Sequence, residues 1–247
     1  MTGRTIAVGD IHGCAAALKT LLDMIAPTPD DTIVTLGDYV DRGPDSRGVI
    51  NQLIELRKRC HLVPLMGNHE EMMLEVVREK QPPYRWLQHG GVDTLDSYGF
   101  CGDMSVIPET HLEFFRSMKD FYETDSHFFV HANYDPNLPL EQQDVHTLRW
   151  QKLTEVTPGP HQNGKRAVVG HTHDRDGEIF KVRHLTCIDT YCYGGRWLTA
   201  LDVTSGTSGK QILRVVCDNA AQQVPEVDFC RSLHERRAPS NNATATH

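Results

Sequence analysis

The chain has 247 residues, of which 39% are hydrophobic and 23% are charged, as is ordinary for a globular protein with a sizeable core. No apolar run reaches the roughly 20 residues that a membrane-spanning helix needs. The formal net charge of −8 argues against general nucleic-acid binding, which requires a basic face.

A strand, a loop and a helix alternate three times at the start of the chain. Short β-branched and apolar runs predict the strands, and apolar residues at helical spacing predict the helices. In chain order, the predicted elements are the strand Arg4–Val8, the helix Ala15–Ile25, the strand Thr32–Leu36, the helix Arg47–Arg59, the strand Leu62–Met66 and the helix Glu70–Arg78. This alternation is typical of a largely parallel sheet, which binds ligands outside the carboxyl ends of its strands.

The pattern changes after residue 80. Residues 82–122 are mostly helical in pattern, and we expect a helical insert near the site. Further strands are predicted at Ser126–His131, Arg166–Val169, Glu178–Val182, His184–Asp189, Trp197–Val203 and Gln211–Val216, the last four antiparallel, with a hairpin turn at Thr204–Gly209. We predict one domain over residues 1–218 and a polar, disordered tail over 219–247.

The seven cysteines are odd in number and form no CxxC pair, so they do not indicate a disulfide framework. Reduced thiols are the simpler interpretation, and the N-terminus runs into a strand without a signal peptide. We therefore expect a cytoplasmic protein.

Polar side chains of metal-ligand type follow strand after strand. They are Asp10 and His12, then Asp38 and Asp41, then Asn68 and His69, and later His131, His171 and His173. Each alone is more often a turn or cap residue, but turn chemistry hardly explains the whole set. Oxygen and nitrogen donors without cysteine suit manganese, iron or zinc rather than a thiolate site.

Three blocks make the pattern recognisable: Gly9–Gly13 (GDIHG), Gly37–Gly43 (GDYVDRG) and Gly67–Glu70 (GNHE). Together they resemble the signature of the calcineurin-like metallophosphoesterases, and more narrowly the bacterial and phage Ser/Thr phosphoprotein phosphatases. The segments Val130–Asn133 and Gly170–Thr172 fit the same pattern. The resemblance implies an α/β fold, a four-layer αββα sandwich of two mixed β-sheets flanked by helices.

The resemblance also implies two divalent metal ions, with Mn²⁺ the first choice and iron, zinc or a mixed pair as alternatives. The implied ligands are Asp10, His12, Asp38, Asn68, His131 and His171. Asp38 would bridge the two ions. His173 has two open interpretations, as a further ligand of the first metal or as a solvent-facing side chain.

The catalytic roles are implied in the same way. His69 would be the general acid, Asp41 would orient it, and Arg42 would grip phosphate oxygens together with Asn68. Arg149 is the candidate for a second phosphate-binding arginine, with Arg196 as an alternative.

Two residues carry no firm role. Tyr191 stands where related bacterial sequences often have glycine; it would narrow the pocket, stack on a substrate or pack. Glu70 opens a helix, where an acidic side chain favours the helix dipole, and we assign it no catalytic role.

These features predict a phosphatase acting on phosphoserine or phosphothreonine in proteins, with phosphotyrosine as a further substrate. The alternative is a dinucleoside polyphosphate hydrolase of the diadenosine tetraphosphate type. A metal-free binding scaffold is a remote alternative, because every implied ligand is present. We expect a monomer that binds a phosphorylated protein or a small phosphoester, and neither nucleic acid nor a membrane.

Overall fold

The computed structural model describes residues 3–78, 80–204 and 212–216. The predicted tail over 219–247 and all of the predicted Thr204–Gly209 turn except Thr204 lie outside the described residues. Within the described ranges, no helix combines the length and the apolar character needed to cross a bilayer.

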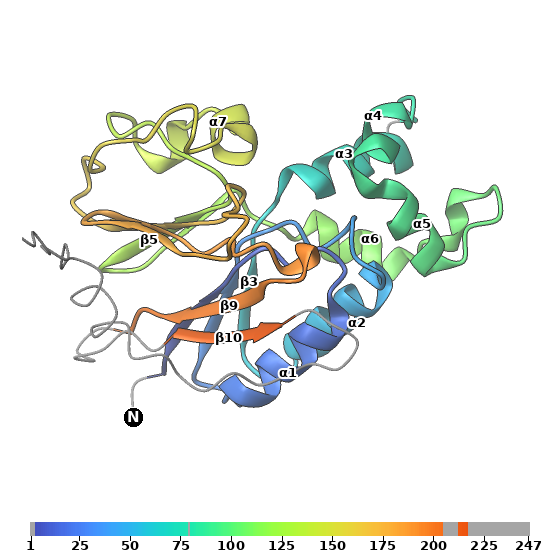
Figure 1. Cartoon of the computed structure of the whole chain (residues 1–247), viewed down its shortest axis with the longest axis horizontal. Coiled ribbons are helices and arrows are strands. Elements are labelled where there is room, and N and C mark those ends of the chain that lie inside the picture. Colours follow the sequence, from blue (N-terminus) through green and yellow to red (C-terminus); the bar gives the residue numbers. More distant parts are fainter. Residues whose placement is uncertain (1–2, 79, 205–211, 217–247) are drawn as a thin grey trace, which may run out of the picture.

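The described strands form two five-stranded mixed sheets, which Figure 1 shows one above the other. The first sheet has the order β10-β9-β1-β2-β3, and the second has the order β4-β5-β6-β8-β7. The strands are β1 Thr5–Val8, β2 Thr32–Thr35, β3 His61–Pro64, β4 Phe121–Glu123, β5 His127–Val130, β6 Arg166–Val169, β7 Phe180–Val182, β8 Leu185–Cys187, β9 Trp197–Asp202 and β10 Ile212–Val216.

Strand direction brings the loops that follow the parallel strands to one edge of each sheet. In the first sheet β1, β2 and β3 are parallel, and β9 and β10 add to them in antiparallel fashion. In the second sheet β5, β6 and β8 are parallel, with β4 and β7 antiparallel. The predicted strand His184–Asp189 corresponds to β8. Its prediction as antiparallel is wrong with respect to β6, because β8 pairs with β6 in parallel.

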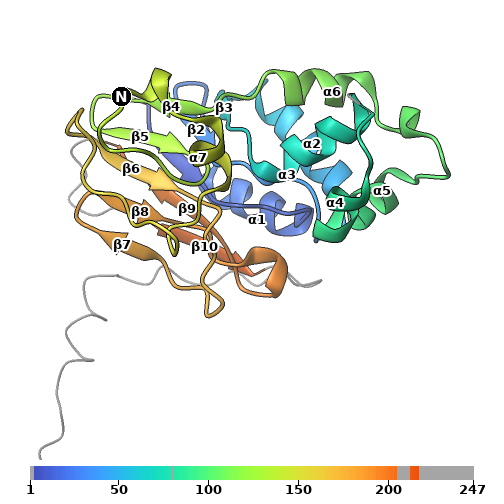
Figure 2. The ribbon, with the colours of Figure 1, turned by 90° about the horizontal axis from the view of Figure 1, so that it is seen from above.

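Helices cover the sheets and extend beyond them, as Figure 2 shows for α2 to α6 on the side away from the strands. The α-helices are α1 Ala15–Ile25, α2 Ser46–Leu56, α3 Asn68–Val77, α4 Tyr84–Trp86, α5 Val92–Tyr98, α6 Glu109–Arg116 and α7 Val145–Trp150. Short 3₁₀ turns lie at Met104–Val106, Leu140–Gln142 and Cys192–Gly194, and a π-helical turn, η1, joins α4 to α5 over Leu87–Gly91.

The three hydrophobic clusters separate four layers. Ala7 of β1 packs with Phe129 of β5 and Val168 of β6 between the two sheets. The neighbours of Ala7, Ile6 and Val8, point to the other face, against α1 and α2. A third cluster lies between the second sheet and α7. Successive strand residues alternate between faces, and this alternation supplies both interfaces from one strand.

The predicted fold class is confirmed by these two mixed sheets and their flanking helices. Residues 82–122 are largely helical, through α4, η1, α5 and α6. Two described elements, the strand β4 and the helix α7, are absent from the prediction. The assignment of residues 1–218 to a single domain stays a prediction.

Candidate metal centre

Loops from both sheets meet where the parallel strands end. Asp10 and His12 follow β1, Asp38 follows β2, and Asn68 opens α3 after β3. From the second sheet, His131 follows β5 and His171 follows β6. All except the half-buried His171 are buried, so sequence segments far apart contribute to one enclosed polar cluster.

Asp38 lies at the middle of this cluster. His12 Nε2 is 3.4 Å from Asp38 Oδ2, whereas His131 Nε2 is 3.4 Å from Asp38 Oδ1. The Oδ1 atom of Asn68 is 3.1 Å from His131 Nε2. Each carboxylate oxygen of Asp38 therefore faces a different group of ligands, which is the arrangement that a bridging carboxylate requires.

Backbone carbonyls fix the histidine rings. His12 Nδ1 is 2.9 Å from the carbonyl of Val40, and His131 Nδ1 is 2.7 Å from that of Leu36. A proton on Nδ1 leaves Nε2 with the lone pair that a metal ion needs, and on His12 this atom also lies 3.0 Å from Arg42 Nη1. Burial also lowers the pKa of both His12 and His131, the latter to about 4, which keeps the rings neutral and competent as ligands.

The surroundings of Asp10 show that the cluster can accommodate a cation. Its Oδ2 accepts a hydrogen bond from the backbone N–H of His171 at 3.0 Å. Its Oδ1 is buried and is the one such side-chain oxygen or nitrogen in the described part of the chain that has no hydrogen-bond partner. A buried acceptor left unpaired is costly, and a metal ion would satisfy it.

The carboxyl groups of the cluster also indicate that it can bind cations. Burial, and then the nearby Asp189 and Asp38, raise the pKa of Asp10 well above its ordinary value. Burial raises the pKa of Asp38 to about 7, and that of Asp189 to about 7. Closely spaced buried carboxylates repel each other, and divalent cations would offset that repulsion. The predicted ligand set omits Asp189, although the sequence places it at the end of a predicted strand.

A histidine–aspartate pair lies beside Asp38. His69 Nδ1 is 2.6 Å from Asp41 Oδ2, and His69 Nε2 is 3.9 Å from Asp38 Oδ2. Burial lowers the pKa of His69, as do His12 and Arg42. Burial raises the pKa of Asp41 well above its ordinary value, and the hydrogen bonds from Thr94 and Trp86 oppose that rise. The His69 ring thus has one nitrogen held and the other directed at the cluster.

The predicted arginines have different surroundings. Arg42 Nη1 is 3.0 Å from His12 Nε2, so this guanidinium lies at the cluster. Arg149, on α7, donates to Asp120 and Glu71 at 2.5 to 3.1 Å. Arg196 donates to the carbonyl of Arg175 and faces Asp176. Both carboxylates would have to release Arg149 before it could contact phosphate, and its role stays a prediction.

The described residues contain two groups with metal-ligand geometry, one of His12, Asp38 and His69, the other of Asp38, His131 and His171. His173 belongs to neither; its ring stacks on Tyr191 with the centroids 4.6 Å apart. The structure brings most of the predicted site residues together at the ends of the parallel strands. Their individual roles remain predictions.

Comparison with known families matches residues 3–175 to the calcineurin-like phosphoesterases. The chain belongs to this family. The predicted membership of the metallophosphoesterases is thereby confirmed. The family works with a binuclear metal centre, which the ligand cluster around Asp38 suits.

Relatives of this phosphoesterase differ in their named substrates. It is 39% identical over 199 residues to serine/threonine-protein phosphatase 1 of Salmonella typhimurium, covering 78% of this chain and 88% of that protein. It is 32% identical over 176 residues to a symmetrical bis(5'-nucleosyl)-tetraphosphatase of Nitrosomonas europaea, covering 69% of this chain. The chain spans only 60% of that enzyme's length, and 46% of its Janthinobacterium counterpart.

Solved structures give the same fold. A protein described provisionally as a diadenosine tetraphosphatase aligns with a TM-score of 0.65 and 25% identity, over 89% of this chain and 96% of that one. A cold-active protein tyrosine phosphatase aligns with a TM-score of 0.66 at 15% identity, over 90% of this chain and 79% of that one, which is a likeness of fold alone.

Three aromatic side chains of the phosphoesterase, Tyr191, Tyr193 and His173, form an aromatic wall beside the cluster. Tyr193 lies edge-on to His12 with the ring centroids 4.8 Å apart, and Tyr191 is 4.8 Å from Tyr193. The guanidinium carbon of Arg42 is 4.7 Å from the Tyr193 ring centroid. All three aromatic residues of the wall are half-buried, so each ring is partly open to solvent.

Backbone strain is concentrated in the loops of the site. Asp38 has φ 51°, Asp41 φ 71° and Arg42 φ 69°, in the left-handed region that favours glycine. Elsewhere in the site His12, His171 and Tyr191 have φ between 44° and 62°. Such strain persists only where the surroundings fix the backbone, and it gathers at functional sites.

Glu70 is one of the residues that fix the strained backbone of these loops. Its buried carboxylate accepts from the backbone N–H groups of Asp38, Tyr39, Val40 and Gly67 at 2.7 to 3.1 Å. It therefore ties the loop after β2 to the start of α3. The interpretation of Glu70 as only a helix-start acid misses this contact, which its sequence position does not reveal.

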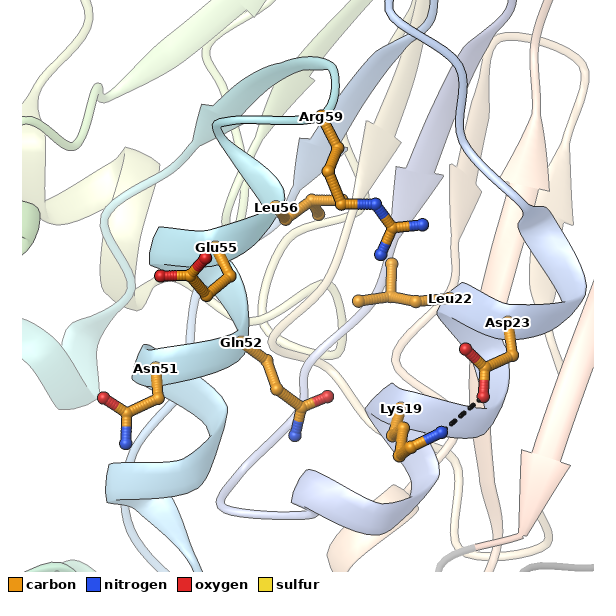
Figure 3. Close-up of a pocket in the computed structure, with 8 residues that line it drawn as sticks. All are labelled: Lys19, Leu22, Asp23, Asn51, Gln52, Glu55, Leu56 and Arg59. Carbon is orange, nitrogen blue, oxygen red and sulfur yellow. Dashed lines mark hydrogen bonds and ion pairs between the residues drawn. The ribbon is translucent and has the colours of Figure 1, made fainter.

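A groove of about 410 Å³ lies between α1 and α2, away from the predicted site residues. Figure 3 shows its lining side chains, among them the Lys19–Asp23 ion pair and Gln52. None of the lining residues is a predicted site residue. The candidate site is therefore the ligand cluster at the strand ends.

Proposed function

We propose that this phosphoesterase hydrolyses dinucleoside polyphosphates by splitting a phosphoanhydride bond. The sequence motifs put phosphoserine and phosphothreonine first, but relatives named symmetrical tetraphosphatases, and the similar chain described provisionally as a diadenosine tetraphosphatase, support the dinucleotide alternative better. The structural observation that carries the proposal is the aromatic wall next to Arg42.

A nucleotide offers a base that such a wall can bind. A phosphate held by Arg42 would place the attached nucleoside near Tyr193 and Tyr191, whose rings are partly open. Stacking of a base on an aromatic side chain contributes about 1–3 kcal/mol. A phosphoserine side chain has no ring to stack, so the aromatic wall would contribute much less binding free energy to a phosphopeptide.

The residues of the site can divide the work. Divalent cations, when bound, polarise the phosphoryl group and lower the pKa of a water molecule. We propose a Mn²⁺ pair, with iron, zinc or a mixed pair as alternatives that the same oxygen and nitrogen donors would suit. Arg42 holds non-bridging phosphate oxygens through its planar fork.

The acid step runs through His69. As the bond from phosphorus to the leaving oxygen breaks, His69 Nε2 gives its proton to that oxygen. The Nδ1–H group stays bonded to Asp41, 2.6 Å away, whose negative charge stabilises the imidazolium before transfer. The ring then takes up a proton from solvent to regain its acid form.

A second candidate is hydrolysis of phosphoserine or phosphothreonine in proteins. An alkoxide is a far worse leaving group than a nucleotide phosphate, so a built proton donor such as the Asp41–His69 pair benefits these esters most. The Salmonella relative, of which this chain covers 88%, supports the same substrate.

The test compares both substrates on one preparation. Protein stripped of metal and reloaded with Mn²⁺ is assayed with diadenosine tetraphosphate and with phosphoserine and phosphothreonine peptides. We expect a higher kcat/KM for the dinucleotide. Preference for the peptides would overturn the proposed substrate and favour the second candidate.

Variants of Tyr191 test the wall itself. Tyr191→Ala should raise KM for the dinucleotide by about tenfold, which matches the loss of one stacked base. Tyr191→Phe keeps the ring and should behave like the wild type. If Tyr191→Ala raised KM for the peptides equally, the aromatic wall would not be recognising the nucleotide base.

A further inference from the structure

The carboxylate of Asp41 is held from a second direction, by the helical segment α4–η1–α5. Trp86 Nε1 donates to Asp41 Oδ1 at 2.9 Å and to Oδ2 at 3.1 Å. The hydroxyl of Thr94 donates to Asp41 Oδ1 at 2.7 Å. With His69 on Oδ2, both carboxylate oxygens have their donors, and the carboxylate plane is fixed.

The backbone of Asp41 is held by the same residues. Its N–H group faces the Thr94 hydroxyl at 2.8 Å and the Ser46 hydroxyl at 3.1 Å. These two hydroxyls lie 3.0 Å from each other. Asp41, Thr94 and Ser46 are fully buried, and Trp86 is 1% exposed, so water does not compete for these contacts. This network also holds Asp41 in its left-handed conformation, φ 71°.

The segment is shaped to reach this loop. A Cβ atom on Gly91 would lie 2.7 Å from two atoms of the Trp86 indole, so only glycine lets the ring lie flat against the η1 turn. Gly90 has φ 105°, and its carbonyl accepts from the N–H of Arg42 at 3.4 Å. The π-helical turn thus brings backbone and indole onto the loop that carries Asp41 and Arg42.

We propose that Trp86 and Thr94 are positioning residues for the proton donor His69. The hydrogen bonds of their side chains go to Asp41 and Ser46, and not to the predicted metal ligands. They hold Asp41 so that its Oδ2 points at His69 Nδ1, which in turn directs Nε2 toward the reacting phosphate. The proton path is unchanged: Nε2 loses its proton to the leaving oxygen, and Asp41 keeps its negative charge.

This inference rests on the proposed function through the acid role of His69, and not through the identity of the natural substrate. The measurement that separates it is the dependence of rate on the leaving group. Phenyl phosphate has a poor leaving group that needs a proton, whereas p-nitrophenyl phosphate has a good one that needs it less.

The decisive variants are Thr94→Val and Thr94→Ser in the full chain with Mn²⁺. Thr94→Val should lower kcat for phenyl phosphate about tenfold, part of the roughly 10²–10⁴-fold that a positioned acid supplies. KM and the rate on p-nitrophenyl phosphate should change much less. Thr94→Ser keeps the hydroxyl and should restore the rate on phenyl phosphate.

Two controls keep the test sharp. Thr20→Val makes the same chemical change on α1, where the hydroxyl bonds only the carbonyl of Ala16, and should leave both rates unchanged. In a His69→Asn background, Thr94→Val should cause no further loss, because its effect passes through His69. Trp86→Phe, which removes the donor but keeps a ring against Gly91, serves as a second variant if Thr94→Val fails to fold.

The outcomes are distinguishable. An active wild type whose rates on both esters fall equally in Thr94→Val and Trp86→Phe, or do not fall, would overturn the positioning role alone. A further loss in the His69→Asn background would do the same. A metal-loaded wild type that cleaves neither ester would overturn this inference, whereas the proposed function is overturned only by the separate assay with diadenosine tetraphosphate.

Discussion

Two buried carboxylates of the phosphoesterase make structural contacts that their positions in the sequence do not reveal. Glu70 lies two residues after Asn68, a predicted ligand, yet it holds the loop that carries Asp38. Asp189 ends the β8 region and comes close enough to Asp10 to raise its pKa. The clustering of the predicted ligands could be inferred because these residues follow strands, whereas these two contacts depend on how the loops pack against each other.

Replacing Glu70 with glutamine tests the first contact. The amide of Glu70→Gln has one acceptor oxygen in place of two, so backbone N–H groups after β2 lose a partner. We expect a loss of about 1–3 kcal/mol in the free energy of unfolding and weaker Mn²⁺ binding. Urea denaturation and calorimetric metal titration measure the two effects. Glu75→Gln, on the same helix, is the matched control, and equal losses in both variants would contradict the assigned role.

At the scale of elements, the connection between α1 and β2 is closed by one ion pair. Asp31 precedes β2 and accepts from the N–H of Thr28 at 2.9 Å and from Arg4 Nη2 at 2.6 Å, just before β1. The Arg4 guanidinium holds the pKa of Asp31 well below its ordinary range. The start of β1 is thereby tied to the start of its parallel neighbour.

This pairing predicts a dependence of stability on pH. Since the pKa of Asp31 is depressed in the folded state, its contribution is present above the unfolded pKa of about 3.9 and is lost as pH falls below it. Asp31→Asn should therefore cost about 1–3 kcal/mol at pH 7, and its difference from wild type should shrink near pH 3. Urea unfolding of metal-free protein measures both, with Asp30→Asn as control. A difference that is the same at both pH values would refute the prediction.

The helical segment α4–η1–α5 gives a second prediction at this scale. A methyl group in Gly91→Ala meets the Trp86 indole at 2.7 Å and must displace it. Overpacking of this kind costs about 1–3 kcal/mol, and the displaced indole should loosen Asp41. We expect a lower melting temperature and a changed tryptophan emission spectrum. Gly159→Ala, where a Cβ atom meets nothing within 4 Å, should change neither.

The elements themselves were predictable to different degrees. The helix Ala15–Ile25 has the predicted bounds, because its apolar spacing spans several turns and Pro27 follows it. In contrast, β4 has three residues and α7 has six, too few for a period to show. The parallel pairing of β8 with β6 could not be inferred from composition, since it depends on the path of the chain between them.

For the whole molecule, the ligand cluster joins the two sheets. Asp10, His12 and Asp38 come from the first sheet, whereas His131 and His171 come from the second. Cations held by both sets would therefore link the halves of the sandwich. Their binding energy adds to the stability of the folded state, since the unfolded chain has no preformed site.

Metal removal should accordingly lower the melting temperature, and Mn²⁺ should restore it. At a free concentration of about 100 times Kd, binding stabilises the fold by about 2.7 kcal/mol. In Asp38→Asn, calorimetry should show little shift with Mn²⁺, because the carboxylate predicted to bridge the cations is gone. Without metal this variant should melt higher than wild type, since it no longer buries that charge. A full shift with Mn²⁺ in the variant would exclude Asp38 as a bridging ligand.

The left-handed residues of the site have a consequence for stability. Each such non-glycine residue costs of order 1–3 kcal/mol, and His12, Asp41, Arg42 and Tyr191 are all of this kind. Glycine at these positions would relieve that strain but remove the predicted functional side chains, so stability and activity oppose each other at this site.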